Sequence, residues 1–184
     1  MRAGRAGTIA GVAALTGVVG ASALLDWATT WGSTLDEQAM DLPGDDYLAG
    51  GPPGRVRMTR AVTVPAPPDQ VWPWLAQLGR GAGFYSFDRL DNGSRPSARH
   101  LVSWIPEPAR GDATAIGYLR DLDPGVGLTW WLPGDPFLGA WTRMVFDVAL
   151  RPEGAQSRLI TRVSGDAEGP TAAPVLVLFR AMDS

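Results

Sequence analysis

Residues 57–92 read RMTRAVTVPAPPDQVWPWLAQLGRGAGFYSFDRLDN, and this stretch indicates the fold more clearly than any other. Apolar and polar residues alternate over residues 57–64, which is the pattern of a half-buried β-strand. Pro67 and Pro68 supply the fixed φ of a helix start, and Asp69 places a negative charge in the first turn. The stretch therefore predicts a strand followed by a helix.

The predicted helix has a single apolar face. Its apolar residues recur at the i, i+3, i+4, i+7 spacing of one helical stripe. They are Val71, Trp74, Leu75 and Leu78. Gly79 can adopt the left-handed conformation that ends a helix. Residues 81–92 then form a loop that contains three aromatic residues.

The rest of the chain predicts several antiparallel strands and a last helix. The strands are expected at 113–120, 128–132, 142–150 and 158–163, and the helix at 174–182. The tetrapeptide LPGD occurs at 42–45 and 132–135, and Pro-Gly predicts a type II turn at each site.

Two runs of the sequence resemble the START-like superfamily, also called SRPBCC, of polyketide cyclase and lipid-transport type. They are PAPPDQVWPWLAQLGRGAGFYSFDRLDN at 65–92 and WGSTLDEQAMDLPGDD at 31–46, which together look like a membrane-associated actinobacterial branch. The resemblance implies an α+β helix-grip fold, in which a curved antiparallel sheet wraps around a long C-terminal helix and encloses an apolar cavity. It implies no single activity, because this scaffold carries, transfers and transforms hydrophobic ligands.

The N-terminus predicts a membrane segment. Residues 8–25 are uncharged, and as a helix they span about 27 Å. Arginines precede the segment and acidic residues follow it, so the positive-inside rule favours a single-pass anchor with the body outside the cytoplasm. A cleaved signal peptide ending near Ala23, which would make the protein secreted, and a cytoplasmic helix are the alternatives.

We therefore expect three parts in the chain. Residues 1–25 are the anchor or signal segment, residues 26–54 an acidic juxtamembrane linker, and residues 55–184 the START-like domain. The apolar run at 174–182 is short for the C-terminal helix of a helix-grip fold, which predicts a short or truncated last helix.

The composition excludes several kinds of chemistry. The net charge is −3, and no basic patch or RNA-binding motif is present, which argues against a nucleic-acid partner. The sequence has no lysine for a Schiff base and no cysteine for a thiol nucleophile or an iron–sulfur cluster. His100 is the only histidine, which excludes a multi-histidine metal site. We expect neither a metal ion nor a cofactor.

Aromatic residues are the candidates for ligand binding. They could form a wall around an apolar ligand, with indole N–H and phenol O–H groups as the few polar contacts. The candidates are Trp74, Phe84, Tyr85, Trp104, Trp130 and Trp141. The alternative is that these residues are ordinary core. Trp130 and Trp131 are adjacent in a strand and must point to opposite faces of the sheet.

Acid–base candidates are few. Asp88 and Asp91 follow the aromatic loop, Tyr85 could donate to a substrate carbonyl, and His100 could act as a general base. Each has an alternative as a surface or core residue. The sequence thus favours a protein that binds or transports a hydrophobic small molecule. The alternatives are a polyketide cyclase or dehydratase and a non-catalytic scaffold whose cavity is filled by tryptophans.

Overall fold

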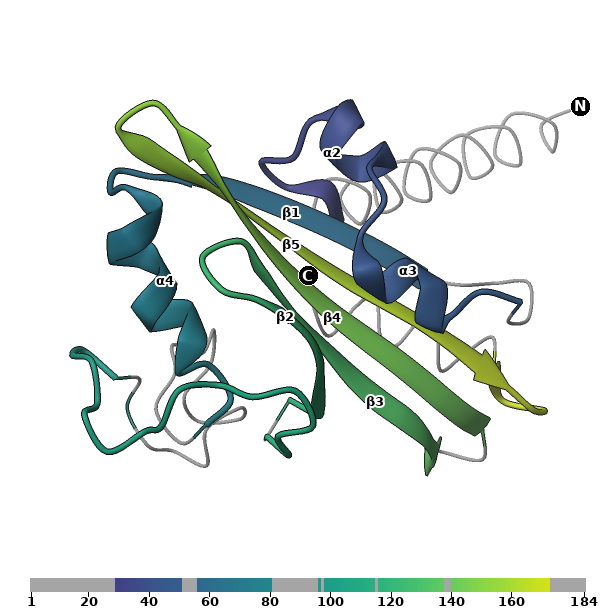
Figure 1. The fold of residues 1–184 in the computed structure, drawn as a ribbon. Helices are drawn as coiled ribbons and strands as arrows, with labels where there is room; N and C mark the ends of the chain where they lie inside the picture. Colours follow the sequence, from purple (N-terminus) through teal and green to yellow (C-terminus); the bar gives the residue numbers. More distant parts are fainter. Residues whose placement is uncertain are drawn as a thin grey trace, which may run out of the picture.

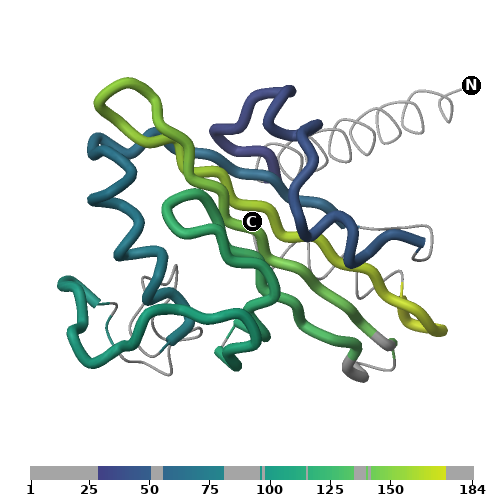
Figure 2. Tube along the Cα trace, viewed as in Figure 1, coloured from purple at the N-terminus to yellow at the C-terminus, as the bar shows by residue number. Residues whose placement is uncertain are grey.

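The computed structural model describes residues 29–50, 56–80, 96, 98–114, 116–137 and 140–172. Its centre is a curved five-stranded antiparallel sheet with the strand order β1-β5-β4-β3-β2 (Figure 1). The strands are β1 (Val56–Val64), β2 (Tyr118–Asp123), β3 (Gly127–Phe137), β4 (Ala140–Glu153) and β5 (Gln156–Glu168). Strands β2 to β5 pair consecutively, and β1 pairs with β5 at the far edge (Figure 2). The antiparallel sheet predicted from the sequence is confirmed.

The strand prediction for 113–120 is wrong in its extent. Strand β2 begins only at Tyr118, and a single isolated bridge joins Tyr118 to Ala113. Gly117 interrupts the chain there with a φ of 142°, which side chains rarely adopt. The alternating pattern indicated a strand in this region, but it could not show that the strand begins only after Gly117.

Both turns predicted at LPGD are wrong. In the first copy, Pro43 is the first residue of the helix α3 (Pro43–Tyr47), where its fixed φ suits the first turn. The second copy lies within β3, where the register to β4 shifts between Leu132 and Asp135. A bulge of this kind accommodates a proline within a strand.

Helix α4 (Pro68–Ala76) follows β1, as the sequence predicts. Val71 and Leu75 are buried, and Leu78 is buried in the turn beyond the helix. Gly79 has a φ of 73°, which confirms the left-handed stop. The helix packs on β4 and β5 through this apolar side.

Residues 29–50, here called the N-terminal strap, contain the helices α2 (Leu35–Ala39) and α3. Thr34 and Glu37 form a capping box at the start of α2. Helix α3 packs on β3 and β4. The strap is therefore part of the folded body, and not the linker that its acidic composition predicts, because Glu37 and Asp45 form ion pairs with arginines of the sheet.

The strap also covers the open edge of β1. The Ala61 amide donates to the Trp31 carbonyl at 3.1 Å, and the Ser33 hydroxyl donates to the Thr59 carbonyl at 2.9 Å. Gly32 has a φ of 71°, and a Cβ there would collide with the carbonyl oxygen of Ala61. This close approach requires glycine.

The two faces of the sheet differ in chemistry. Successive strand residues point to opposite faces, so Trp130 and Trp131 are separated, as predicted. The apolar face packs against α4 and carries Leu128, Trp130, Phe146, Val148 and Leu150. The polar face lies under the strap and carries Thr129, Asp147, Arg162, Ser164 and Asp166. Figure 1 shows α3 in front of the sheet, α2 above the β1 edge and α4 at the left end of the sheet.

The predicted segment at 8–25 and the predicted helix at 174–182 lie outside the described residues. Within the described ranges, no helix has the length and apolar character needed to cross a bilayer. The curved antiparallel sheet with α4 beside it is consistent with an α+β helix-grip fold.

Candidate functional site

The apolar face is the first candidate for a ligand surface. One cluster of buried residues lies where α4 covers the sheet, and it includes Leu75, Leu119, Trp130 and Val148. A second, smaller cluster formed by Val56, Met58, Ala140 and Ala167 lies toward the other end of β1. The face is therefore apolar along its length.

Four apolar side chains in the middle of this face are only partly buried, and we call them the central strip. They are Leu132, Met144, Phe146 and Val163. Met144 pairs with Leu132 across β3 and β4, and Phe146 pairs with Val163 across β4 and β5, so the four side chains share one face. Apolar area left accessible on an inner face is typical of a surface that receives an apolar partner.

Trp130 lies beside the central strip. Its side chain is 2% exposed, and its ring stacks on Phe146 with the ring centroids 5.4 Å apart. Its indole Nε1 is buried and has no hydrogen-bond partner among the residues that the structure describes. A buried donor without a partner costs about 1–3 kcal/mol, so this N–H is a polar group for which an acceptor is missing.

The described residues do not bring the predicted aromatic wall together. Trp74 is half-buried on α4, and Trp104 is 71% exposed in the loop after His100. Trp141 lies in β4. Phe84 and Tyr85 lie outside the described residues. Of the six candidates, Trp130 is the one that the structure places in the buried cluster of the apolar face.

Of the acid–base candidates, the structure describes His100 alone. Asp88, Asp91 and Tyr85 lie outside the described residues. His100 has an exposed side chain, and its backbone carbonyl accepts a hydrogen bond from Gln77. Over the described ranges, no group of three potential ligands could hold a metal ion.

The polar face contains a carboxyl group that the sequence candidates did not include. Asp147 is buried beneath α3, and its Oδ1 accepts from the Gly44 amide at 3.0 Å and from the Thr129 hydroxyl at 2.7 Å. Burial raises the pKa of Asp147 to about 6, the nearby charge of Asp45 adds to the rise, and the hydrogen bonds and Arg162 oppose it. An aspartate in the middle of an otherwise apolar strand was the available signal.

Arg162 connects the polar face to the strap. Its side chain is fully buried, and all five N–H donors of a guanidinium are used. Nε donates to the Thr59 hydroxyl at 3.0 Å. The other donors reach the strap, at the carbonyls of Glu37, Gln38 and Met40 and at the carboxylate of Asp45.

A second arginine extends this connection. Arg158 bonds the Glu37 carboxylate at 2.7 Å and the Gly32 carbonyl at 2.6 Å. The Arg158 hydrogen bond holds the pKa of Glu37 at about 2. Most polar groups of this face thus bond within the protein, while Asp147 Oδ2 and the Ser164 hydroxyl have no partner among the described residues.

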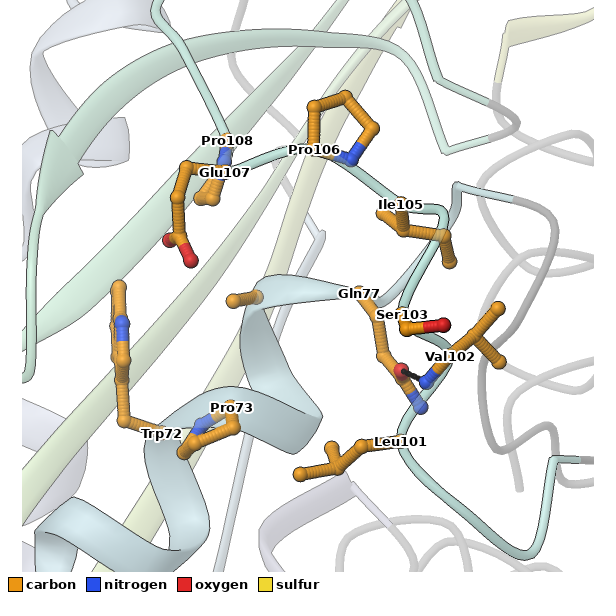
Figure 3. Close-up of a pocket in the computed structure, with 11 residues that line it drawn as sticks. Trp72, Pro73, Gln77, Leu101, Val102, Ser103, Ile105, Pro106, Glu107 and Pro108 are labelled. Atoms are coloured by element: carbon orange, nitrogen blue, oxygen red, sulfur yellow. Dashed lines mark hydrogen bonds between the residues drawn. The ribbon is translucent and has the colours of Figure 1, made fainter.

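A pocket of about 280 Å³ lies outside the sheet, between α4 and residues 101–108 (Figure 3). Gln77 connects its two walls, because its Oε1 accepts from the Val102 amide at 3.0 Å while its Nε2 donates to the His100 carbonyl at 3.5 Å. One turn later, Arg80 donates to the Pro106 carbonyl and forms an ion pair with Asp112. The end of α4 therefore holds this loop in place.

No family model and no curated protein matches the chain. Among solved structures, it is similar to Ara h 8.0201, with 16% identity, a TM-score of 0.43, and coverage of 70% of this chain and 88% of that chain. It is also similar to the Mll3558 protein from Rhizobium loti, with 15% identity, a TM-score of 0.36, and coverage of 71% and 97%. These similarities show nothing about activity. The fold class is assigned from the sheet and α4 of this chain.

Proposed function

We propose that this protein binds and carries a hydrophobic small molecule, such as a lipid, an isoprenoid or a polyketide-like compound, on the apolar face of its sheet. The observation that supports the proposal is the central strip, four apolar side chains that remain partly accessible between two buried clusters. Packing an apolar ligand there removes further apolar area from water, worth about 25 cal/mol per Å².

The ligand is expected to carry at least one hydrogen-bond acceptor. Trp130 offers a buried indole N–H on the same face as the strip, and none of the described residues accepts from it. A carbonyl or hydroxyl oxygen on the ligand would satisfy this donor and fix the orientation of an otherwise featureless molecule.

Binding without catalysis fits the placement of the ionisable groups. Asp147, whose pKa lies near neutrality, is on the polar face, and both of its hydrogen-bond donors belong to the protein. A general acid or base must lie within hydrogen-bond reach of the substrate, and the sheet separates Asp147 from the apolar face.

The test is a titration of the full-length chain with N-phenyl-1-naphthylamine, a neutral apolar fluorescent probe. We expect micromolar affinity, about −8 kcal/mol. Met144→Ala removes part of the strip and should weaken binding about tenfold. Val126→Ala, at an exposed position of the β2–β3 turn, is the matched control and should bind as the parent chain does. Absence of probe binding, or equal affinity in both variants, would reject the apolar face as the site.

We also propose that residues 1–25 tether the domain to a membrane, with the binding body outside the cytoplasm. The charge asymmetry around residues 8–25 supports this orientation. The test is a phosphatase fused after Ser184 and assayed in intact cells, beside a reporter that works only in the cytoplasm. Phosphatase activity supports the orientation, and cytoplasmic reporter activity with a silent phosphatase reverses it.

A further inference from the structure

We propose that the pocket between α4 and residues 101–108 is a second binding site, for a small organic cation with a substituted ammonium group and an apolar body. This pocket lies across α4 from the apolar face, and Trp72 borders both, because it lines the pocket and packs against the sheet cluster. Val71 and Leu75 point from α4 into the sheet cluster, whereas Pro73, Ala76 and Gln77 line the pocket on the other side of the helix.

The lining of the pocket combines polar groups with apolar side chains that can hold an apolar body. The side chains around it are largely proline and aliphatic residues, and the polar side chain of Gln77 is already bonded to the opposite wall. The apolar lining consists of Pro73, Leu101, Val102, Ile105, Pro106 and Pro108. The volume of about 280 Å³ lies just below the range of about 300–1,000 Å³ that is usual for small-molecule sites.

The charge of the pocket favours a cation. Trp72 and Glu107 both line it, and Figure 3 shows their side chains on the same side. An indole face attracts an ammonium group through its quadrupole, and a carboxylate supplies the countercharge. Glu107 is exposed and forms no ion pair with any residue in the described ranges.

The Arg80 guanidinium, which bonds to one wall of the pocket, does not cancel the charge of Glu107. Arg80 is directed to the Pro106 carbonyl and to the Asp112 carboxylate, which is 3.3 Å away. Its charge is therefore balanced within the wall of the pocket. The Ser103 hydroxyl completes the polar groups of the lining without adding charge.

The test uses benzyltrimethylammonium and phenylmethanesulfonate, which have similar size and opposite charge. Binding to the full-length chain is followed by NMR of the tryptophan indole resonances, so that Trp72 and Trp130 report on the two sites separately. We expect the cation to bind at least tenfold more tightly than the anion and to shift the Trp72 resonance alone.

Glu107→Gln should weaken cation binding about threefold to tenfold and leave anion binding unchanged. Asp36→Asn, at an exposed position of α2, is the matched control and should bind the cation as the parent chain does. Equal binding of the two probes, no binding of the cation, or identical affinities for Glu107→Gln and the parent chain would overturn the proposal. Because Glu107 is exposed, its substitution tests the charge without unfolding the domain.

Discussion

The same strands form the two faces of the sheet. The faces differ in how far their side chains are bonded to or covered by the rest of the protein. On the polar face, every donor of Arg162 has an acceptor, and four of the five bonds reach the strap. On the apolar face, the central strip is partly accessible and the Trp130 indole N–H has no acceptor within the described part of the chain. The difference indicates that the polar face holds the structure together, while the apolar face retains capacity for a ligand.

Among the substitutions that test this contrast, Arg162→Ala should change the free energy of unfolding most. It removes a fully buried guanidinium and leaves the Asp45 carboxylate and three strap carbonyls with unused acceptors. We expect a loss of about 3–5 kcal/mol in the free energy of unfolding, measured with denaturant. Arg151→Ala, at an exposed position of β4, should stay within about 0.5 kcal/mol of the parent chain. Equal losses in the two variants would mean that the polar face has no special role in stability.

The next effect depends on pH. The pKa of Asp147 rises from 3.8 to about 6 in the folded state, mainly because burial disfavours the charged form. Folding therefore becomes less favourable as pH rises from about 4 through about 6, by about 3 kcal/mol in total, because one pKa unit corresponds to about 1.36 kcal/mol.

Asp147→Asn should remove this slope, because an amide keeps the oxygen that accepts from Gly44 and Thr129 but does not ionise. The measurement is the urea midpoint of both chains between pH 4 and pH 7.5. A parent chain whose stability rises over that interval would contradict the assignment. Glu37 acts in the opposite sense, because its pKa of about 2 gives stability that is lost as pH falls below about 4.5.

A smaller loss is expected from Gly44→Ala. A Cβ at this position in α3 would collide with Cγ1 of Val145 and with the Asp147 carboxylate. Helix α3 must then move away from the sheet, at a cost of about 1–3 kcal/mol in unfolding free energy. Asp46→Ala, which is exposed in the same helix, controls for the change in helix propensity and should have little effect. If both variants unfold at the same denaturant concentration, the close packing of α3 contributes nothing.

The smallest change in stability should come from the apolar face. Met144 is only partly buried, so Met144→Ala should cost about 1 kcal/mol, less than the 2–5 kcal/mol of a fully buried position. Its effect on probe binding should be larger than its effect on stability. A loss of several kcal/mol, measured by the same denaturant titration, would identify the central strip as ordinary core.

The sequence predicted the parts of the fold that local patterns determine. The alternation of β1, the proline start of α4 and the stop at Gly79 all depend on neighbours within a few residues. The strap was missed because its partners are distant, with a sequence separation of 103 positions from Gly44 to Asp147 and 117 from Asp45 to Arg162. Without those partners, the run of carboxylates has the composition of a solvated linker.

The candidate site was predicted from residue types, and types do not determine which side chains converge. The placement of Trp130 and Trp131 on opposite faces follows from strand alternation, and that prediction is confirmed. The exposure of Trp104 depends on how the loop of residues 101–108 is held by Gln77 and Arg80, which no local pattern reveals. The pocket beside α4 was missed for the same reason.

The contact of the strap with β1 has a consequence for self-association. An open sheet ends in strands whose outward N–H and C=O groups can pair with a second molecule and begin aggregation. Residues 31–33 occupy such groups on Thr59 and Ala61, and Gly32 permits the approach. The strap thus stabilises the sheet and also blocks strand pairing at the β1 edge. Substitutions that detach the strap should therefore lower solubility as well as stability.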